Sequence, residues 1–230
     1  MMPSIVVMHA SDVDPTATTR RGDENLLQFE DILVDELVPL IRQRYRVRAD
    51  ASSWAIAGVS LGGEFAVYTG LQHPELFASI GSISGSLVPR GDEEENLPSM
   101  DQRFGPALAR PDVSTDYQLV WIGCGTSDNV CGGSRVFVER LQAAEVAHTW
   151  REYAGGHQMP VFRRELLDLP QVCSFSSRPP PERARRRRNS LKERIRAIGI
   201  AFRLTAIRGR APAGPDRIAD GLHEALCALR

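Results

Sequence analysis

The chain has 230 residues, of which 42% are hydrophobic and 25% charged, and its formal net charge at pH 7 is −1. This is enough for one globular domain with a sizeable core and an additional segment. No apolar run approaches the roughly 18 residues that span a bilayer, and the opening MMPSIVVMHA lacks the basic start and the apolar length of a signal peptide. We therefore expect a cytoplasmic protein.

The first elements alternate between strand and helix. Residues 4–9 (SIVVMH) form a short β-branched run that is typical of a buried strand. Apolar residues at helical spacing predict a helix over about 26–45, residues 54–57 (WAIA) are a second strand, and residues 61–72 are a helix that ends before His73 and Pro74.

The alternation continues in the second part of the chain. The further elements are a strand at 77–83, a long connection at 84–116 with one short helix near 100–109, a strand at 118–123, a helix at 133–145, a strand at 148–153 and a short helix at 160–168. Five strand–helix alternations imply parallel βαβ units with right-handed crossovers. We expect an α/β fold, with a mostly parallel sheet of about five strands flanked by helices on both faces.

The charge is unevenly distributed along the chain. Residues 1–175 carry 14 basic and 24 acidic side chains, whereas residues 176–230 carry 14 basic and 5 acidic side chains. Three prolines at 179–181 interrupt the chain near this change, and four arginines follow at 185–188. We expect a domain over 1–175 and an Arg-rich tail over 176–230 that is disordered or partly helical.

Part of the tail has helical periodicity. Leu191, Ile195, Ile198 and Phe202 fall at helical spacing among basic residues. A basic amphipathic helix can bind a membrane surface or nucleic acid. We favour a disordered extension, a helix that rests on the acidic domain, or a fused or frame-altered segment, and we expect no nucleic-acid partner.

The chain contains four cysteines, at positions 124, 131, 173 and 227. Their spacing matches no common zinc pattern and no histidine pair accompanies them. We expect free thiols and no metal or organic cofactor, and a Cys124–Cys131 disulfide remains an open alternative.

The run GVSLGG at 58–63 matches the Gly-x-Ser-x-Gly pattern. It follows a predicted strand and opens a predicted helix, which is the context of a nucleophile elbow. Such a turn exposes Ser60 Oγ above the carboxyl ends of the strands, and the Leu61 amide at the helix start points to where an oxyanion would form. This context makes an ordinary Gly-rich turn the weaker interpretation.

A serine nucleophile needs a base, and the base needs an orienting acid. In this type of fold the chain order is serine, then acid, then histidine. Asp128 follows the strand at 118–123, and His157 follows the strand at 148–153. Alone, each is also explained as a turn residue; together they follow parallel strands that end at one edge of the sheet. Glu64 and Glu152 are alternative acids, but neither follows a strand end beside the elbow.

The chain resembles the esterase-D-type branch of the α/β hydrolases, which includes enterochelin esterases and feruloyl esterases. The similar segments are GVSLGGEFAVYTGLQHPELFASIGSISGSL at 58–87, DELVPLIRQRYRV at 35–47, WIGCGTSDN and GGHQMPVFRR. The stretch TTRRGDENL at 19–27 resembles the enterochelin-esterase group, and the similarity covers about residues 3–172. It implies Ser60 as nucleophile, Asp128 as acid and His157 as base.

The resemblance also implies a missing element. The family has a strand between the equivalents of 4–9 and 54–57, and the loop after that strand supplies the second oxyanion donor. Relative to the family the chain lacks these N-terminal strands, so the flanking strands must either close the gap or leave buried backbone groups unpaired. Losing one oxyanion donor typically lowers turnover ~10²–10³-fold.

We expect a serine carboxylic-ester hydrolase that forms an acyl-enzyme and acts on a siderophore or another small ester. Arg20, Arg21 and residues 84–116 are candidates for contact with the substrate. Two alternatives are a catalytically impaired, hydrolase-like binding protein and an acyltransferase of the same superfamily.

Overall fold

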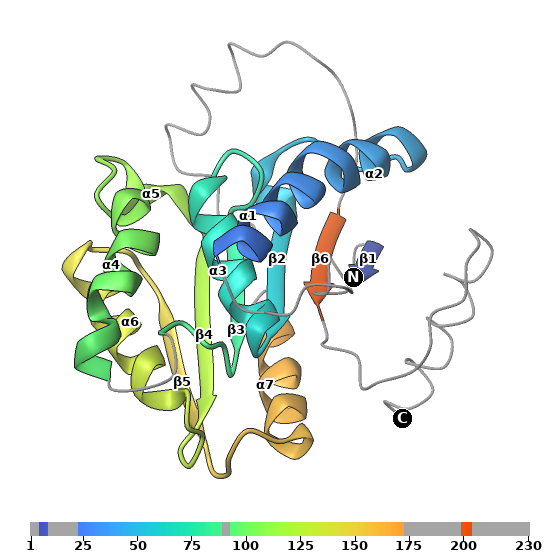
Figure 1. Ribbon diagram of the computed structural model, residues 1–230. Helices are drawn as coiled ribbons and strands as arrows, with labels where there is room; N and C mark the ends of the chain where they lie inside the picture. The colour runs from blue at the N-terminus through green and yellow to red at the C-terminus, as the bar shows by residue number, and fades with distance from the viewer. Residues whose placement is uncertain (1–4, 9–22, 89–92, 173–198, 204–230) are drawn as a thin grey trace.

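A computed structural model describes residues 5–8, 23–88, 93–172 and 199–203. Its centre is a parallel sheet of six strands in the order β1-β6-β2-β3-β4-β5 (Figure 1). The strands are β1 (Ile5–Met8), β2 (Trp54–Val59), β3 (Ser79–Ile83), β4 (Leu119–Gly125), β5 (Thr149–Tyr153) and β6 (Gly199–Arg203). The expected parallel α/β architecture is confirmed.

Seven α-helices lie within the described residues. They are α1 (Asp23–Asp31), α2 (Val38–Arg44), α3 (Leu61–Gln72), α4 (Glu93–Leu108), α5 (Val113–Asp116), α6 (Cys131–Ala143) and α7 (Met159–Val172). A π-helical turn (Ile32–Leu37) joins α1 to α2, and a short 3₁₀ helix (Ala51–Ser53) precedes β2. In this part of the chain no helix combines the length and the apolar content needed to cross a membrane.

The π-helical turn follows from the spacing of buried residues. Leu26, Phe29 and Leu33 are separated by three and four positions, but the next buried residue, Val38, follows Leu33 after five. The wider π-helical turn keeps Leu33 and Val38 on the buried side of the helix, and the Val38 N–H donates to the Leu33 carbonyl. Pro39 has no N–H to donate, which also disfavours a regular α-helical turn here.

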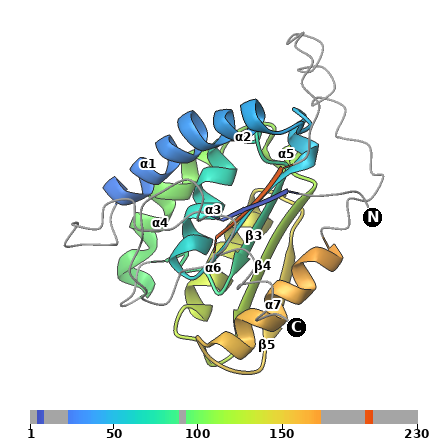
Figure 2. The same ribbon diagram turned by 90° about the vertical axis from the view of Figure 1, so that its right-hand side faces the viewer.

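The two faces of the sheet are covered unequally. Helices α1, α3, α4 and α6 lie on one face and α7 lies on the other (Figure 2). Strand residues alternate between the faces, as the pleat requires. Ile56, Ile80 and Ile122 belong to the large core under the first group of helices, whereas Val59 and Trp121 belong to a smaller core under α7.

Helix α4 corrects the prediction of a short helix within a long connection. The segment contains Pro98, Gly105 and Pro106, which disfavour a regular helix. Met100 and Phe104 are nevertheless fully buried against the large core. Burial of this apolar side outweighs the weak local propensity, and the helix runs from Glu93 to Leu108.

Strand β6 corrects two further expectations. Residues 199–203 lie between β1 and β2, where Ala201 pairs with Val7 on one side and with Ile56 on the other. The prediction that helical spacing continues to residue 202 is therefore wrong for these residues, because two neighbouring strand edges offer the backbone hydrogen bonds that a helix would otherwise supply. Within the described residues the sheet has six strands, close to the expected number of about five. The gap expected between β1 and β2 is filled by a segment of the tail.

The other parts of the tail, residues 176–198 and 204–230, lie outside the described residues, as do Arg20 and Arg21. The expected boundary at residue 175 stays a prediction.

Candidate active site

Ser60 occupies the sharp turn between β2 and α3. Its backbone angles, φ 55° and ψ −123°, fall in a region that non-glycine residues rarely adopt. The turn requires close approach of the backbone, because a Cβ atom at Gly58 would lie 2.0 Å from the carbonyl oxygen of Gly62. The sequence pattern thus produces a strained strand–turn–helix with the geometry of a nucleophile elbow, and we call this turn the elbow.

The turn after β3 holds the elbow from both sides. The Ser60 N–H donates to the carbonyl of Ile83 at 2.9 Å, and the Ser86 N–H donates to the carbonyl of Ser60 at 3.3 Å. Ser84 lies between Ile83 and Ser86 and has a φ angle of 45°. Its N–H donates to the Gly123 carbonyl at 2.9 Å. We call residues 83–86 the elbow platform, since it fixes the backbone of Ser60.

Asp128 lies in the loop that follows β4, and its side chain is fully buried. Its Oδ1 accepts the Val130 N–H at 3.1 Å, and its Oδ2 faces Nδ1 of His157 at 2.8 Å. Both carboxyl oxygens are therefore placed to accept hydrogen bonds.

His157 follows β5 and joins Asp128 to Ser60. Its Nε2 lies 2.9 Å from Ser60 Oγ. Since an ionised Asp128 can only accept, Nδ1 carries the proton and Nε2 accepts the hydrogen bond from the serine hydroxyl. The edge of the Phe162 ring packs against the imidazole, with ring centroids 4.8 Å apart, and restricts its rotation.

Backbone hydrogen bonds tie the loops of the acid and the histidine together. Thr126 N–H donates to the Tyr153 carbonyl at 2.8 Å, and Ser127 N–H donates to the Gly155 carbonyl at 2.9 Å. A Cβ atom at Gly125 would lie 2.5 Å from that same Gly155 carbonyl oxygen. The two loops therefore approach as closely as glycine allows, which brings their side chains within hydrogen-bonding distance.

Leu61 is the first residue of α3, directly after Ser60. The first N–H groups of a helix have no acceptor within the helix, and they point toward the end at which Ser60 lies. The position of the Leu61 amide is compatible with a contact to an anion beside the serine, and its role as an oxyanion donor stays a prediction. Strand β6 pairs with the strand that leads to Ser60, β2, and the residues after Arg203 lie outside the described part of the chain. The second oxyanion donor that the resemblance implies stays a prediction.

The two alternative acids have other partners. Glu64 forms an ion pair with Arg103 of α4. Glu152 forms an ion pair with Arg135 of α6, with 2.8 Å between Nε and Oε1. Neither replaces Asp128 at His157.

Cys124 and Cys131 are buried free thiols on either side of the Asp128 loop. Burial raises the pKa of both thiols, which keeps them protonated at neutral pH. Cys173 and Cys227 lie outside the described residues. Among the residues that are described, no three His, Cys, Asp or Glu side chains are arranged to hold a metal ion.

Glu165 of α7 contacts the elbow platform, and the sequence analysis did not identify it. Its side chain is completely buried, and Ser84 Oγ of the elbow platform donates to its two carboxyl oxygens at 3.3 and 3.2 Å. Burial raises the pKa of Glu165 to about 8, and the nearby Asp128 carboxylate acts in the same direction. At neutral pH, Glu165 is therefore a neutral acid.

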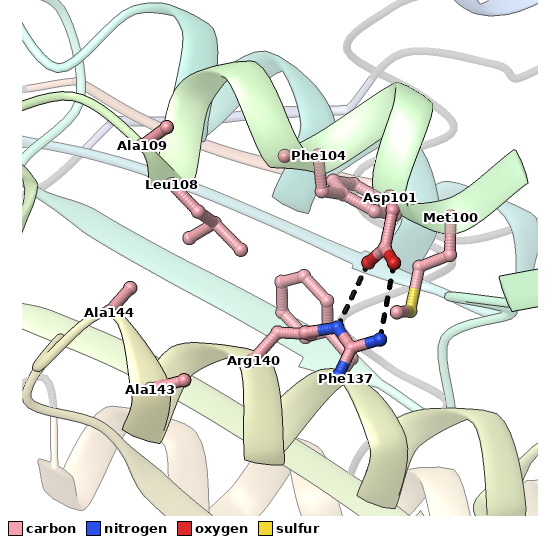
Figure 3. Close-up of a pocket in the computed structure, with 10 residues that line it drawn as sticks. Met100, Asp101, Phe104, Leu108, Ala109, Phe137, Arg140, Ala143 and Ala144 are labelled. Carbon is pink, nitrogen blue, oxygen red and sulfur yellow. Dashed lines mark hydrogen bonds and ion pairs between the residues drawn. The ribbon is translucent and has the colours of Figure 1, made fainter. Parts of the chain in front are cut away.

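A cavity of about 270 Å³ lies away from these residues, between α4 and α6 (Figure 3). Asp101 and Arg140 link the two helices beside it with hydrogen bonds of 2.9 and 3.1 Å. Its other lining residues are mostly apolar and include Phe104 and Phe137. Ser60, Asp128 and His157 do not line this cavity, so we do not assign it to the serine site.

The sequence profile of the putative esterase family matches residues 3–170. An endo-1,4-beta-xylanase/feruloyl esterase of Xylanibacter ruminicola is 29% identical over 142 residues, which cover 62% of this chain and 17% of the relative. The iron(III) enterobactin esterase of Escherichia coli K12 is 26% identical over 170 residues, which cover 72% of this chain and 40% of the relative. The chain spans less than half the length of both relatives.

Solved structures share the fold. A ferulic acid esterase from Anaeromyces mucronatus superimposes with a TM-score of 0.55 at 22% identity, over 68% of this chain and 59% of that one. The enterochelin esterase from Shigella flexneri gives a TM-score of 0.54 at 24% identity, over 71% of this chain and 41% of that one. The fold supports the match of the sequence profile, and the chain belongs to the putative esterase family.

Proposed function

We propose that this chain is a serine carboxylic-ester hydrolase in which Ser60 is the nucleophile, His157 the base and Asp128 the orienting acid. The observation that carries the proposal is the continuous chain of hydrogen bonds from Ser60 Oγ through His157 to Asp128, with spacings of 2.9 and 2.8 Å. Both spacings are within the range for proton transfer and orientation.

In the acylation step, Ser60 Oγ attacks the ester carbonyl and its proton passes to Nε2 of His157. The imidazolium that forms is stabilised by Asp128, whose buried carboxylate is already hydrogen-bonded to Nδ1. The carbonyl oxygen becomes negatively charged and accepts the Leu61 N–H. Collapse of the tetrahedral intermediate breaks the ester C–O bond, and the alcohol leaves with the proton held by His157.

In the second step, the same groups act on water. His157 removes a proton from a water molecule, and the hydroxide attacks the acyl-enzyme carbonyl. The tetrahedral intermediate then expels Ser60, which takes back the proton, and the carboxylic acid is released. The step requires water to reach His157, and the imidazole side chain is 27% exposed.

For the substrate, we propose a small ester. The names of the relatives mention ferulic acid and enterobactin. Both names belong to ester hydrolases. They support an ester as the substrate of this chain, and they do not identify its acyl group.

Labelling with a fluorophosphonate probe tests the nucleophile, and hydrolysis of p-nitrophenyl acetate tests turnover. The matched control is Ser60→Ala, which keeps the backbone and removes the hydroxyl. We expect labelling at Ser60 and turnover that both disappear in the variant. Absence of labelling in the unmodified chain would contradict the proposal and favour a non-catalytic, hydrolase-like binding protein. Labelling elsewhere would contradict the assignment of Ser60.

A further inference from the structure

Glu165 contacts the elbow platform from the opposite side to the nucleophile. The backbone of Ser60 is bonded to Ile83 and Ser86, and Ser84 lies between them. The described contacts fix Ser84 twice, through its N–H to Gly123 and through its hydroxyl to Glu165. Glu165 therefore touches neither Ser60 nor His157 but holds the segment on which Ser60 rests.

Among the described groups around Glu165, only the hydrogen bonds with Ser84 favour a negative charge, and burial outweighs them. Along α7 it lies between the buried residues Val161 and Leu169. From the sheet, the groups that face it are the Ser84 hydroxyl of the platform, the Cys124 thiol of β4 and the Tyr153 phenol of β5. From the loop after β4 comes the Asp128 carboxylate.

Each of these groups is neutral or negative. Tyr153 donates its hydroxyl to Asp168 at 2.7 Å, one turn further along α7. Arg164, the cation next to Glu165 in the chain, bonds the Ala154 carbonyl at 3.2 Å. An ionised Glu165 would thus be a buried charge facing a second carboxylate, which is strongly unfavourable.

We propose that Glu165 is a positioning residue that holds the elbow platform as a neutral acid and releases it on ionisation, so that it sets the alkaline limit of the reaction. The inference rests on the proposed ester hydrolysis. In the neutral state, the carboxyl group hydrogen-bonds Ser84 and carries no charge. In the ionised state, the Ser84 hydrogen bonds favour the charge, but burial and repulsion from Asp128 outweigh them. The side chain then moves toward water, and the platform loses its second attachment.

The pH dependence follows from the pKa of Glu165, which burial raises to about 8. The active form is the protonated one, so kcat decreases as the pH rises through this value. For one ionisation, kcat at pH 9 is roughly tenfold below that at pH 7. Glu165→Gln keeps the shape and the neutral hydrogen-bonding group, and we expect it to retain kcat at pH 7 and to lose the alkaline decrease.

Ser84→Ala tests the other partner. It removes the Ser84 hydroxyl and leaves Glu165 in place. Alanine and serine are equally strained at the positive φ of residue 84, so the backbone strain does not change. We expect kcat to fall roughly 10- to 100-fold at pH 7, with KM little changed, because small misplacements of a nucleophile lower the rate by such factors. Asp168→Asn is the matched control on α7, and we expect it to keep the pH profile of the unmodified chain.

The experiment measures kcat and KM from pH 6 to 9.5, with Ser60→Ala as the blank for alkaline hydrolysis. The carboxyl carbon of Glu165 is followed by NMR over the same range and assigned by its absence in Glu165→Gln. Two results together support the proposal. The Glu165 carboxyl carbon titrates near pH 8, and kcat decreases at alkaline pH in the unmodified chain but not in Glu165→Gln. Titration below pH 6, or the same decrease in Glu165→Gln, would overturn it. Absence of both turnover and probe labelling would instead overturn the proposed function.

Discussion

The two faces of the sheet each bury a glutamate and treat it differently. On the face covered by α3 and α4, Glu64 forms an ion pair with Arg103. On the face covered by α7, Glu165 hydrogen-bonds Ser84 and lies near Asp128, which is itself an acid. A neighbouring cation favours the charged form of a buried carboxyl group, whereas burial without a cation favours the protonated form.

The two faces also differ in the size of their apolar cores and in their distance along the chain from the serine site. The face with Glu64 holds the large apolar core, from Leu26 to Val146. The face with Glu165 holds a small core, and α7 begins directly after the loop of His157. The charged pair links α3 to α4, and the neutral acid contacts the platform that bonds the backbone of Ser60. The variants below test this comparison.

The largest effect is expected at the reaction itself. In Asp128→Asn the amide can donate to Nδ1 of His157, which places the imidazole proton on Nε2 and prevents it from accepting the proton of Ser60. We expect kcat to fall about 10⁴-fold with the fold intact, as hydrolysis of p-nitrophenyl acetate and circular dichroism will measure.

Glu152→Gln is the control for this change, because Glu152 is paired with Arg135 and does not contact His157. Loss of activity in the control, or less than a tenfold loss in Asp128→Asn, would contradict the assignment of the acid.

On the opposite face, Arg103→Gln should act on stability. It leaves Glu64 without its charged partner in a nearly buried position, where the two side chains are 14% and 11% exposed. Breaking such a pair costs about 3 kcal/mol of unfolding free energy. Urea denaturation measures the loss, and the double variant with Glu64→Gln should recover most of it, because no unpaired charge remains. A double variant as unstable as the single one would show that the charge is not the cause.

The comparison of faces assumes that the sheet is continuous between β1 and β2. Ala201→Pro removes an N–H in the middle of β6 and leaves a carbonyl of a neighbouring strand without a donor. We expect a loss of ~1–3 kcal/mol in unfolding free energy. Ala201→Gly, which keeps the N–H, is the control. Equal stabilities of the proline and glycine variants would contradict the pairing of β6.

The smallest effect is expected at His73, which ends α3. Hydrogen bonds that its ring donates to Glu30 at 2.8 Å and to Glu75 at 2.9 Å raise its pKa to about 9. A raised histidine pKa adds stability that is complete below pH 6.5 and is lost as the pH rises to 9. The group is partly exposed, so this contribution is below about 1 kcal/mol.

Glu30→Gln should reduce the loss of thermal stability between pH 6.5 and 9. Glu165 also lowers stability as the pH rises, from about 4.5 to 8, because its pKa is raised to about 8. Measuring Glu30→Gln in the Glu165→Gln background separates the two. An unchanged slope would contradict the role of the Glu30–His73 pair.

The sequence by itself determined the parallel α/β fold and the placement of Ser60, Asp128 and His157 at strand ends. Glycine spacing at the elbow and the alternation of apolar runs are local signals, because they are set by backbone sterics and by periodic burial. A further signal was present at Glu165, which lies four residues from both Val161 and Leu169 on the buried side of α7.

Tertiary structure alone decided the partner of each charge and the place of the tail segment. Nothing in the chain near Glu64 or Glu165 indicates that the first meets an arginine and the second a serine, since Arg103 and Ser84 are brought to them by packing of α4 and β3. Strand β6 was likewise unpredictable from residues 199–203, because its conformation depends on two strand edges about 140 and 190 residues earlier in the chain. A local sequence pattern therefore predicts a helix or strand only where the same pattern also indicates what that element packs against.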